Sequence, residues 1–327
     1  MNEPIGLVLK DPAWRSVLPL GLYVLLKGLD ATVLKALQTY GAAHTVNGEN
    51  PISFCNVFFV AQLVIGLASL IPGRASIGPG MALLNVADRK LLFIDAGLGL
   101  FIGPIAYYFA LESLSVISQT LLFALVLPVS ALLARQFLAE TLPRGFWLSL
   151  SLIATGLLLP GAAMAAAGGH GDQLSGYGWA LVGVLAFSST AVTGRSIATR
   201  HWPAVVTVGI PSTISALLFG IIALVLFGPG HFHLLNLRWV VGVILIYGLT
   251  LSLGSSRALA LAYRHCSVAT VSIWGSLTLV VAIASAALLL GEPLGMATMA
   301  GVVILLAGIL ISHRAKRSDP VLRRYIS

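Results

Sequence analysis

Two oppositely charged side chains, Lys27 and Asp30, stand in the middle of a long apolar run near the start of the chain. Three residues apart on a helix, they would share one face and lie within reach of each other. An ammonium beside a carboxylate has three possible roles. The pair can fix helix packing, Asp30 can take up a proton, or both groups can bind a zwitterionic or charged solute. Ionisable groups inside a membrane are costly and usually face a cavity or each other, so we favour the two functional roles.

A second basic residue, Arg257, lies six residues before Tyr263, at the end of another apolar run. That separation corresponds to about 9 Å along a helix. The Arg257 guanidinium would either extend to the inner membrane interface or contact an anionic group in a cavity. Further candidates for the lining of a cavity are polar or aromatic residues within apolar runs: Asn56, Gln119, Ser189, Thr190 and Trp274.

The sequence carries no signature of an enzyme or of a nucleotide site. It has no G-x-x-x-x-G-K-S/T loop for ATP, no H-E-x-x-H and no G-x-S-x-G. His231 and His233 could bind a metal, but two histidines alone are weak evidence for a metal site. We therefore expect no catalytic residue, no metal and no cofactor, and any transport would have to use a gradient or solute exchange.

The composition places the chain in a bilayer. Hydrophobic residues make up 58% of the 327 positions and charged residues only 9%, which is too apolar for an ordinary soluble domain. A helix crosses the hydrocarbon with about 20 apolar residues, and the chain contains ten such runs. The expected spans are 17–40, 52–71, 91–111, 116–138, 146–167, 178–197, 204–227, 239–263, 268–290 and 296–313.

The net charge of +8 would suggest a nucleic-acid partner in a soluble protein, but here the basic residues gather in alternate connections. Because Lys and Arg in short loops stay cytoplasmic, both termini are predicted to be cytoplasmic, in the inner membrane of a bacterium, with no nucleic-acid partner. The basic residues of the predicted cytoplasmic segments are Lys10, Arg15, Arg74, Arg89, Lys90, Arg135, Arg144, Arg200, Arg264 and those after His313.

A motif recurs at an offset of 152 residues. Its members return in the same order: Glu140, Leu142 and Gly156 as Glu292, Leu294 and Gly308. Between the two copies the basic residues move from one end of the helices to the other; Arg144 of the first copy, for example, aligns with Met296 of the second. The two copies are therefore predicted to be inverted relative to each other, an arrangement typical of secondary transporters. Both glutamates stand where one helix ends and the next begins, so we expect them to cap helix N-termini.

The predicted fold is thus an all-α integral membrane protein of ten transmembrane helices in two inverted five-helix repeats. Residues 1–167 would form the first repeat, and residues 168–327 the second repeat with its basic cytoplasmic tail. The glycine- and alanine-rich stretch between the repeats carries no Lys or Arg, as an outer connection should.

Several short pieces match the pattern of a known family. They are Ala110-Leu111 before a short turn, Pro128, Ala139-Glu140-Thr141-Leu142 leading to Gly156, and Gly291-Glu292-Pro293-Leu294 leading to Gly301 and Gly308. With these pieces the chain resembles the EamA-type branch of the drug/metabolite transporter superfamily, which has ten helices in two repeats. The chain departs from that pattern at Val280, where the family has proline, and at Ala139, where glycine is common. The resemblance implies a solute site between the first, third, fourth, sixth, eighth and ninth helices.

These observations together favour a secondary active transporter. It would export a small polar metabolite such as an amino acid by alternating access, with protons as a candidate coupling ion. One alternative is a transporter of a phosphorylated solute or nucleotide sugar. Such a solute needs paired basic groups, of which only Lys27 and Arg257 are available. Another alternative is a non-transporting membrane scaffold, whose interior would be filled by large apolar side chains.

Overall fold

The computed structural model describes residues 14–139, 142, 145–166, 172–200, 202–265 and 274–317. Within these ranges the chain is helical, and the only β-type pairing is one isolated bridge between Val46 and Glu49. Seven helical stretches have the length and apolarity to cross a membrane, and three shorter apolar helices accompany them. The chain is therefore a helical integral membrane protein, as its composition predicts.

The predicted apolar runs coincide with helices to within a few residues. The ninth run is the exception, because α14 covers only part of it and residues 266–273 lie outside the described ranges. The helices of the first half are α1 (Trp14–Ala43), α2 (Phe54–Gly73), η1 (Arg74–Ser76), α3 (Ile77–Ala82), α4 (Val86–Ala96), η2 (Gly97–Ile102), α5 (Gly103–Ser113), α6 (Val116–Phe123), α7 (Val126–Leu138) and α8 (Phe146–Ala166). Those of the second half are α9 (Asp172–Ala198), η3 (Val205–Gly209), α10 (Ile210–Phe227), η4 (Pro229–Asn236), α11 (Arg238–Tyr247), η5 (Gly248–Gly254), α12 (Ser255–His265), α14 (Leu277–Leu289) and α15 (Met296–Arg317).

Three of the long helices contain a π-helical segment, namely η2, η3 and η5. Pro104 and Pro211 each stand just after such a segment. A proline lacks an N–H and its ring clashes with the carbonyl four residues earlier, so a wider turn accommodates it. The carbonyl of Leu100, which Pro104 cannot use, accepts a hydrogen bond from Ser215 Oγ of α10 at 2.7 Å. The helix disturbance expected at Pro211 thus accompanies a π turn.

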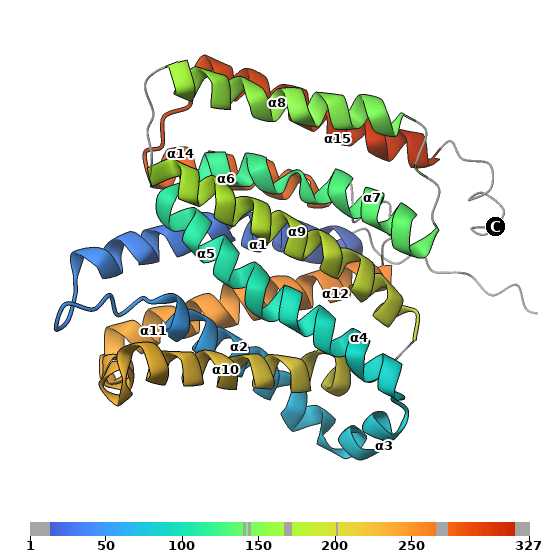
Figure 1. Ribbon diagram of the computed structural model, residues 1–327. Coiled ribbons are helices and arrows are strands. Elements are labelled where there is room, and N and C mark those ends of the chain that lie inside the picture. The colour runs from blue at the N-terminus through green and yellow to red at the C-terminus, as the bar shows by residue number, and fades with distance from the viewer. Residues whose placement is uncertain are drawn as a thin grey trace, which may run out of the picture.

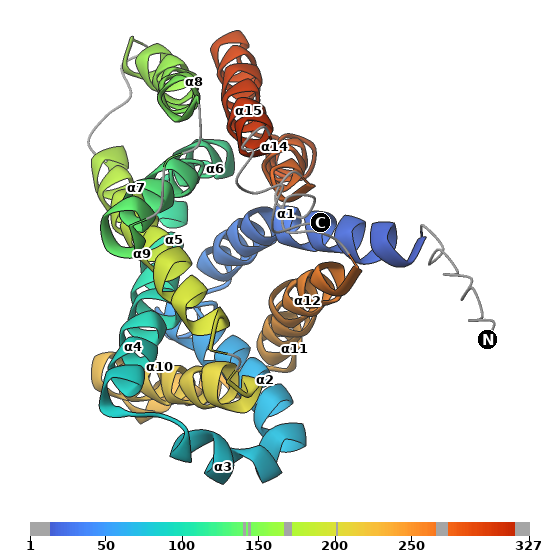
Figure 2. The ribbon, with the colours of Figure 1, turned by 90° about the vertical axis from the view of Figure 1, so that its right-hand side faces the viewer.

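The helices lie side by side in a bundle with their axes inclined to one another, and in Figure 2 the right-hand side of Figure 1 faces the viewer. α8 and α15 form a pair at the top of both views, whereas α2, α10 and α4 lie toward the bottom. α1 begins and α15 ends at the same end of the bundle, the right-hand end in Figure 1. We call this the first end, and we call the other, where α1 ends, the second end.

The repeated glycines allow α8 and α15 to pack closely. A Cβ atom added to Gly156 would lie 2.6 Å from the carbonyl oxygen of Gly301. Gly308 approaches α8 in return, and its carbonyl accepts a hydrogen bond from Ser149 Oγ at 2.7 Å. In a membrane, where hydrophobicity cannot drive helices together, small residues permit such close contact. The glycines of the motif therefore have a packing role.

Large apolar side chains cover much of the outside of the bundle. Phe93, Phe137, Val225 and Leu288 are each more than 70% exposed. Soluble proteins rarely present so much apolar surface, whereas lipid covers it without cost. Inside, the fully buried Phe219 contacts the rings of three other phenylalanines, with ring centres 5.1–6.5 Å apart.

Candidate functional site

A cavity of about 960 Å³ lies between the helices. Its walls come from both halves of the chain, chiefly from α1, α2, α6, α7, α9, α12 and α14. The lining includes Asp30 in the middle of α1 and also Phe146 and Arg195, which lie toward the first end on α8 and α9. The cavity therefore extends from the middle of the bundle toward the first end, and its size suits a small organic molecule.

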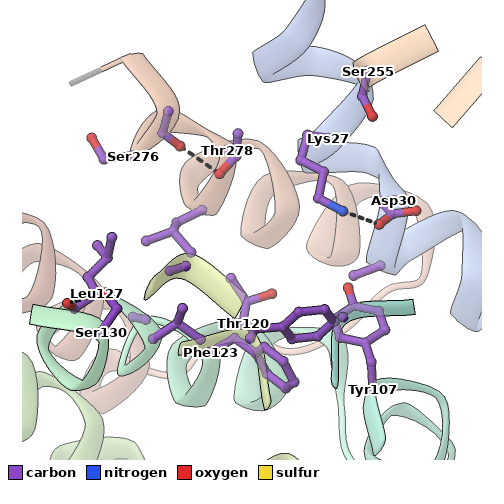
Figure 3. A pocket seen from close by; sticks show the side chains of 18 of the residues that line it. Lys27, Asp30, Tyr107, Thr120, Phe123, Leu127, Ser130, Ser255, Ser276 and Thr278 are labelled. Atoms are coloured by element: carbon purple, nitrogen blue, oxygen red, sulfur yellow. Dashed lines mark hydrogen bonds and ion pairs between the residues drawn. The ribbon is translucent and has the colours of Figure 1, made fainter. Parts of the chain in front are cut away.

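The deepest charged group in the cavity is Asp30, which is 8% exposed. Lys27 Nζ lies 2.7 Å from one of its carboxylate oxygens, and the Tyr247 hydroxyl donates to the other at 2.8 Å. Figure 3 shows Lys27 and Asp30 side by side on α1, above the ring of Tyr107. The Lys27 side chain is 50% exposed, toward the cavity. An ammonium has three donors, so two remain for a bound molecule.

Two buried amides line the same cavity. Gln119 of α6 donates through Nε2 to the carbonyl of Tyr107 at 3.1 Å, which fixes its orientation. The Oε1 atoms of Gln119 and of Gln62, on α2, are buried and have no hydrogen-bond partner among the described residues. A buried acceptor without a donor costs free energy. These two oxygens are therefore suited to accept hydrogen bonds from a bound solute.

Hydroxyl groups line the cavity toward the first end, from α7, α12 and α14 (Figure 3). Ser130 donates to Leu127 O at 2.9 Å, and Thr278 donates to Gly275 O at 2.7 Å. Such bonds to the helix's own backbone are common for hydroxyls in helices and leave oxygen lone pairs available. The side chains that α7, α12 and α14 contribute to the wall carry no charge, so the charged lining residue toward the first end is Arg195 of α9.

The structure brings three of the eight residues predicted for the site into the cavity wall: Lys27, Asp30 and Gln119. The other five are Asn56, Ser189, Thr190, Trp274 and Arg257, which are not among the lining residues. Asn56 is fully buried and donates to Pro51 O at 3.1 Å, while Ser189 bonds to its own helix. Arg257 is exposed, and its guanidinium contacts the carbonyl of Ala68 at 3.4 Å. Arg257 thus lies outside the cavity.

Several lining residues were not predicted from the sequence. Tyr247 is the most important of them, because it holds Asp30 from a position 217 residues away. A tyrosine in the middle of an apolar run is a weak signal, since its ring is itself apolar. Tyr107, Gln62 and Thr120 also line the cavity. Gln62, an amide within an apolar run, gave a signal comparable to that of Gln119.

Two charged side chains hold the turn between α5 and α6 at the second end of the bundle. The Lys35 ammonium on α1 contacts the carbonyls of Leu111, Glu112 and Leu114 at the C-terminus of α5. Glu292 accepts hydrogen bonds from the backbone N–H groups of Val116 at 2.7 Å and Ile117 at 3.0 Å, which begin α6. A cation at a helix C-terminus and a carboxylate at an N-terminus both complement the helix dipole. The turn between α5 and α6 is therefore held from both sides.

The prediction that Glu292 caps a helix N-terminus is confirmed. The capped helix is α6 of the first half of the chain and not α15, the helix that follows Glu292. Glu140, its counterpart in the motif, lies outside the described residues.

Both ring nitrogens of His231, a candidate metal ligand, already have partners: its Nδ1 lies 2.6 Å from Glu49 Oε2 and its Nε2 lies 3.0 Å from Ser53 Oγ. Within the described residues no group of three metal-ligating side chains occurs.

Comparison with known proteins finds similarity to transporters. Residues 174–314 match the EamA-like transporter family. An uncharacterized transporter of Synechocystis sp. is 29% identical over 309 residues, which cover 90% of this chain and 85% of the relative. A crystal structure whose description names no function has a TM-score of 0.52 and 18% identity, and covers 90% of this chain and 98% of its own. That likeness concerns the fold alone. The resemblance to the drug/metabolite transporter superfamily is confirmed.

Proposed function

We propose that this chain, which is similar to the EamA-like transporter family and to an uncharacterized transporter, is a secondary active exporter of a small zwitterionic metabolite such as an amino acid. The observation that carries this proposal is the ion pair of Lys27 and Asp30 at the inner part of a cavity of about 960 Å³. A bundle that served only as a scaffold would bury apolar side chains there. A polar cavity inside an apolar bundle is suited to a solute that lipid excludes.

We interpret the ten apolar helical stretches as ten membrane crossings in two inverted repeats, 1–167 and 168–327. Helix contacts recur in the pairs that a two-fold relation would generate. α5 packs on α9 as α12 packs on α1, and α7 packs on α9 as α14 packs on α1. The helices α2 and α10, like α8 and α15, pack against their own counterparts. The π-helical segments η2 and η5 also stand at the 152-residue offset of the motif, within one residue. These regularities support the repeat.

The orientation follows from the charges at the two ends. Arg89, Lys90 and Arg200 lie at the first end. The acidic Glu49 and Glu292 belong to connections at the second end, where Glu112 stands in the last turn of α5. By the positive-inside rule, the first end and both termini are cytoplasmic, in a bacterial inner membrane. The cavity then faces the cytoplasm, where an exporter collects its solute. Release outside requires the contacts of Lys35 and Glu292 to open while the cytoplasmic side closes.

The lining favours a zwitterion. The free donors of Lys27 can bind a carboxylate, and the amide oxygens of Gln62 and Gln119 can accept from an ammonium. The rings of Tyr107 and Phe123 offer an apolar surface for the rest of the solute. A phosphorylated solute fits less well, because the basic lining side chains are Lys27 and Arg195 and the carboxylate of Asp30 opposes an anion.

Solute counterflow into lipid vesicles that contain the purified protein tests the function. We would screen labelled amino acids, nucleosides, sugar phosphates and quaternary amines against vesicles preloaded with the same unlabelled solute. We expect an amino acid to exchange. Lys27→Met should abolish that exchange, whereas Arg257→Gln, a change outside the cavity, should keep it. Exchange of a sugar phosphate alone would show that the solute is wrongly assigned. No exchange in any class by folded protein would contradict transport.

A further inference from the structure

A second carboxylate lies within a membrane-spanning stretch but away from the cavity. Asp95 of α4 stands five residues after Lys90, the last basic residue before an apolar run. Five helical residues correspond to about 7.5 Å along the axis. The stretch Val86–Ser113 is long and apolar enough to cross a membrane, and Phe93 and Ile94 on it are exposed as lipid-facing residues are. Asp95 is half-buried and is not among the residues that line the cavity.

The one hydrogen bond to the Asp95 side chain in the described structure comes from α9. Thr193 Oγ1 donates to Asp95 Oδ1 at 2.5 Å. No Lys or Arg of the described chain lies within ion-pairing distance of Asp95. The neighbouring elements η2 and α10 contribute no titratable side chain. Besides Asp95, the charged residues of α4 are Asp88, Arg89 and Lys90, and those of α9 are Asp172 at its start and Arg195 in the cavity wall. Asp88 is paired with Arg200, just after the end of α9.

The other carboxylate inside the bundle makes the contrast plain. Asp30 also accepts a hydrogen bond from a hydroxyl on another helix, that of Tyr247, but Lys27 neutralises its charge. Asp95 and Tyr247 stand 152 residues apart, which is the offset of the repeated motif. Tyr247 directly precedes the π-helical segment η5, and Asp95 lies two residues before η2. The first half thus has a carboxylate, Asp95, where the second half has the hydroxyl of Tyr247, although their partners Thr193 and Asp30 do not share that offset. Of the two carboxylates, Asp95 has no cationic partner among the described residues.

An unpaired carboxylate in a membrane is costly as an anion, and the binding of one proton removes that cost. Thr193 serves both states of the carboxyl group. Its hydroxyl can donate to ionised Asp95. It can also turn to the carbonyl of Ser189, 3.3 Å away, and accept a hydrogen bond from protonated Asp95. The contact therefore persists whether or not the proton is bound.

We propose that Asp95 is the site at which this protein binds its coupling proton, separate from the solute site at Lys27 and Asp30. The proposal rests on the transport function proposed above. The contact between α4 and α9 continues directly into the cavity wall through η2. A Cβ atom on Gly99 of η2, which lines the cavity, would lie 2.9 Å from Thr190 of α9. A shift of α4 against α9 on protonation would therefore change the shape of the solute site.

Infrared difference spectroscopy between acidic and alkaline samples of the purified protein in lipid tests proton binding without any solute. We expect the carbonyl stretch of a protonated carboxylic acid in the acidic sample. It should disappear in Asp95→Asn, which keeps an acceptor for Thr193, and stay in Asp30→Asn. Thr193→Val, which removes the hydroxyl, should shift the frequency of the band, and Thr193→Ser, which keeps a hydroxyl, should leave the band at the frequency seen in the parent. A band that survives Asp95→Asn, or one that Asp30→Asn removes, would overturn the proposal.

A transport measurement separates this proposal from the function itself. In vesicles, Asp95→Asn should retain counterflow of the amino acid found in the screen but lose its accumulation against a gradient when a pH difference is imposed. If Asp95→Asn accumulates solute like the parent protein, Asp95 is not the coupling site, although transport stands. If the parent exchanges no solute, the transport function fails, while the infrared result still decides proton binding.

Discussion

In the proposed orientation the second end faces outward, and the contact of Glu292 with the start of α6 should control whether this end opens. Glu292→Gln keeps the shape of the side chain but removes its charge and one of the two oxygens that accept from Val116 and Ile117 at 2.7 and 3.0 Å. A hydrogen bond to a charged group contributes about 1.5–3 kcal/mol. If the contact exists only while the outer end is closed, its loss should favour the open form about 10- to 100-fold, at about 1.4 kcal/mol for each factor of ten.

The assay is the labelling rate of a single cysteine at Leu114, which is 3% exposed beside this contact. The two native cysteines are replaced first. If the labelling rate follows the population of the open form, an impermeant maleimide added outside should react about 10- to 100-fold faster with the Glu292→Gln variant than with the parent. Glu112→Gln is the matched control, because it removes a nearby exposed carboxylate with no side-chain hydrogen bond. Equal rates in the parent and both variants would refute the reasoning.

Three further results are expected. Cysteines placed at Arg144 and at Met296 should react with impermeant reagents from opposite sides of the membrane, and labelling of both from one side would end the inverted-repeat interpretation. Gly156→Ala should lower the free energy of unfolding by about 1–3 kcal/mol through overpacking, because its Cβ would lie 2.6 Å from a backbone oxygen. In thermal unfolding, Gly97→Ala, which meets no atom within 4 Å, should be near neutral by comparison. Arg257→Gln should bind solute like the parent; weaker binding of a carboxylate-bearing solute would place Arg257 at the site after all.

Sequence patterns predicted the helices well, because a bilayer demands about 20 apolar residues for each crossing. They also identified Lys27 and Asp30, since charges inside an apolar run stand out. The same signal marks Asp95, which the sequence analysis passed over. Tyr247 gave no such signal, because its role depends on a contact across 217 residues of chain.

Glu292 caps a helix N-terminus as predicted, but for a physical reason the helix is not the one that follows it in the chain. Local sequence suggests that a carboxylate at a helix junction caps the next helix, as Pro293 after it also suggests. In the structure, packing between the two halves places the start of α6 closer to that carboxylate. Contacts of this kind depend on how the halves meet. A single sequence does not encode them in any short pattern.

The most direct test of the central claim is the reactivity of one cavity residue from both sides of the membrane. Thr120 lines the cavity and is 7% exposed, so a single cysteine there should be reached only through an open pathway. If the protein works by alternating access, Thr120→Cys should react with impermeant reagents added to either side, and saturating transported solute should slow both reactions. Reaction from the cytoplasmic side alone, unchanged by any solute that the vesicles exchange, would contradict the account.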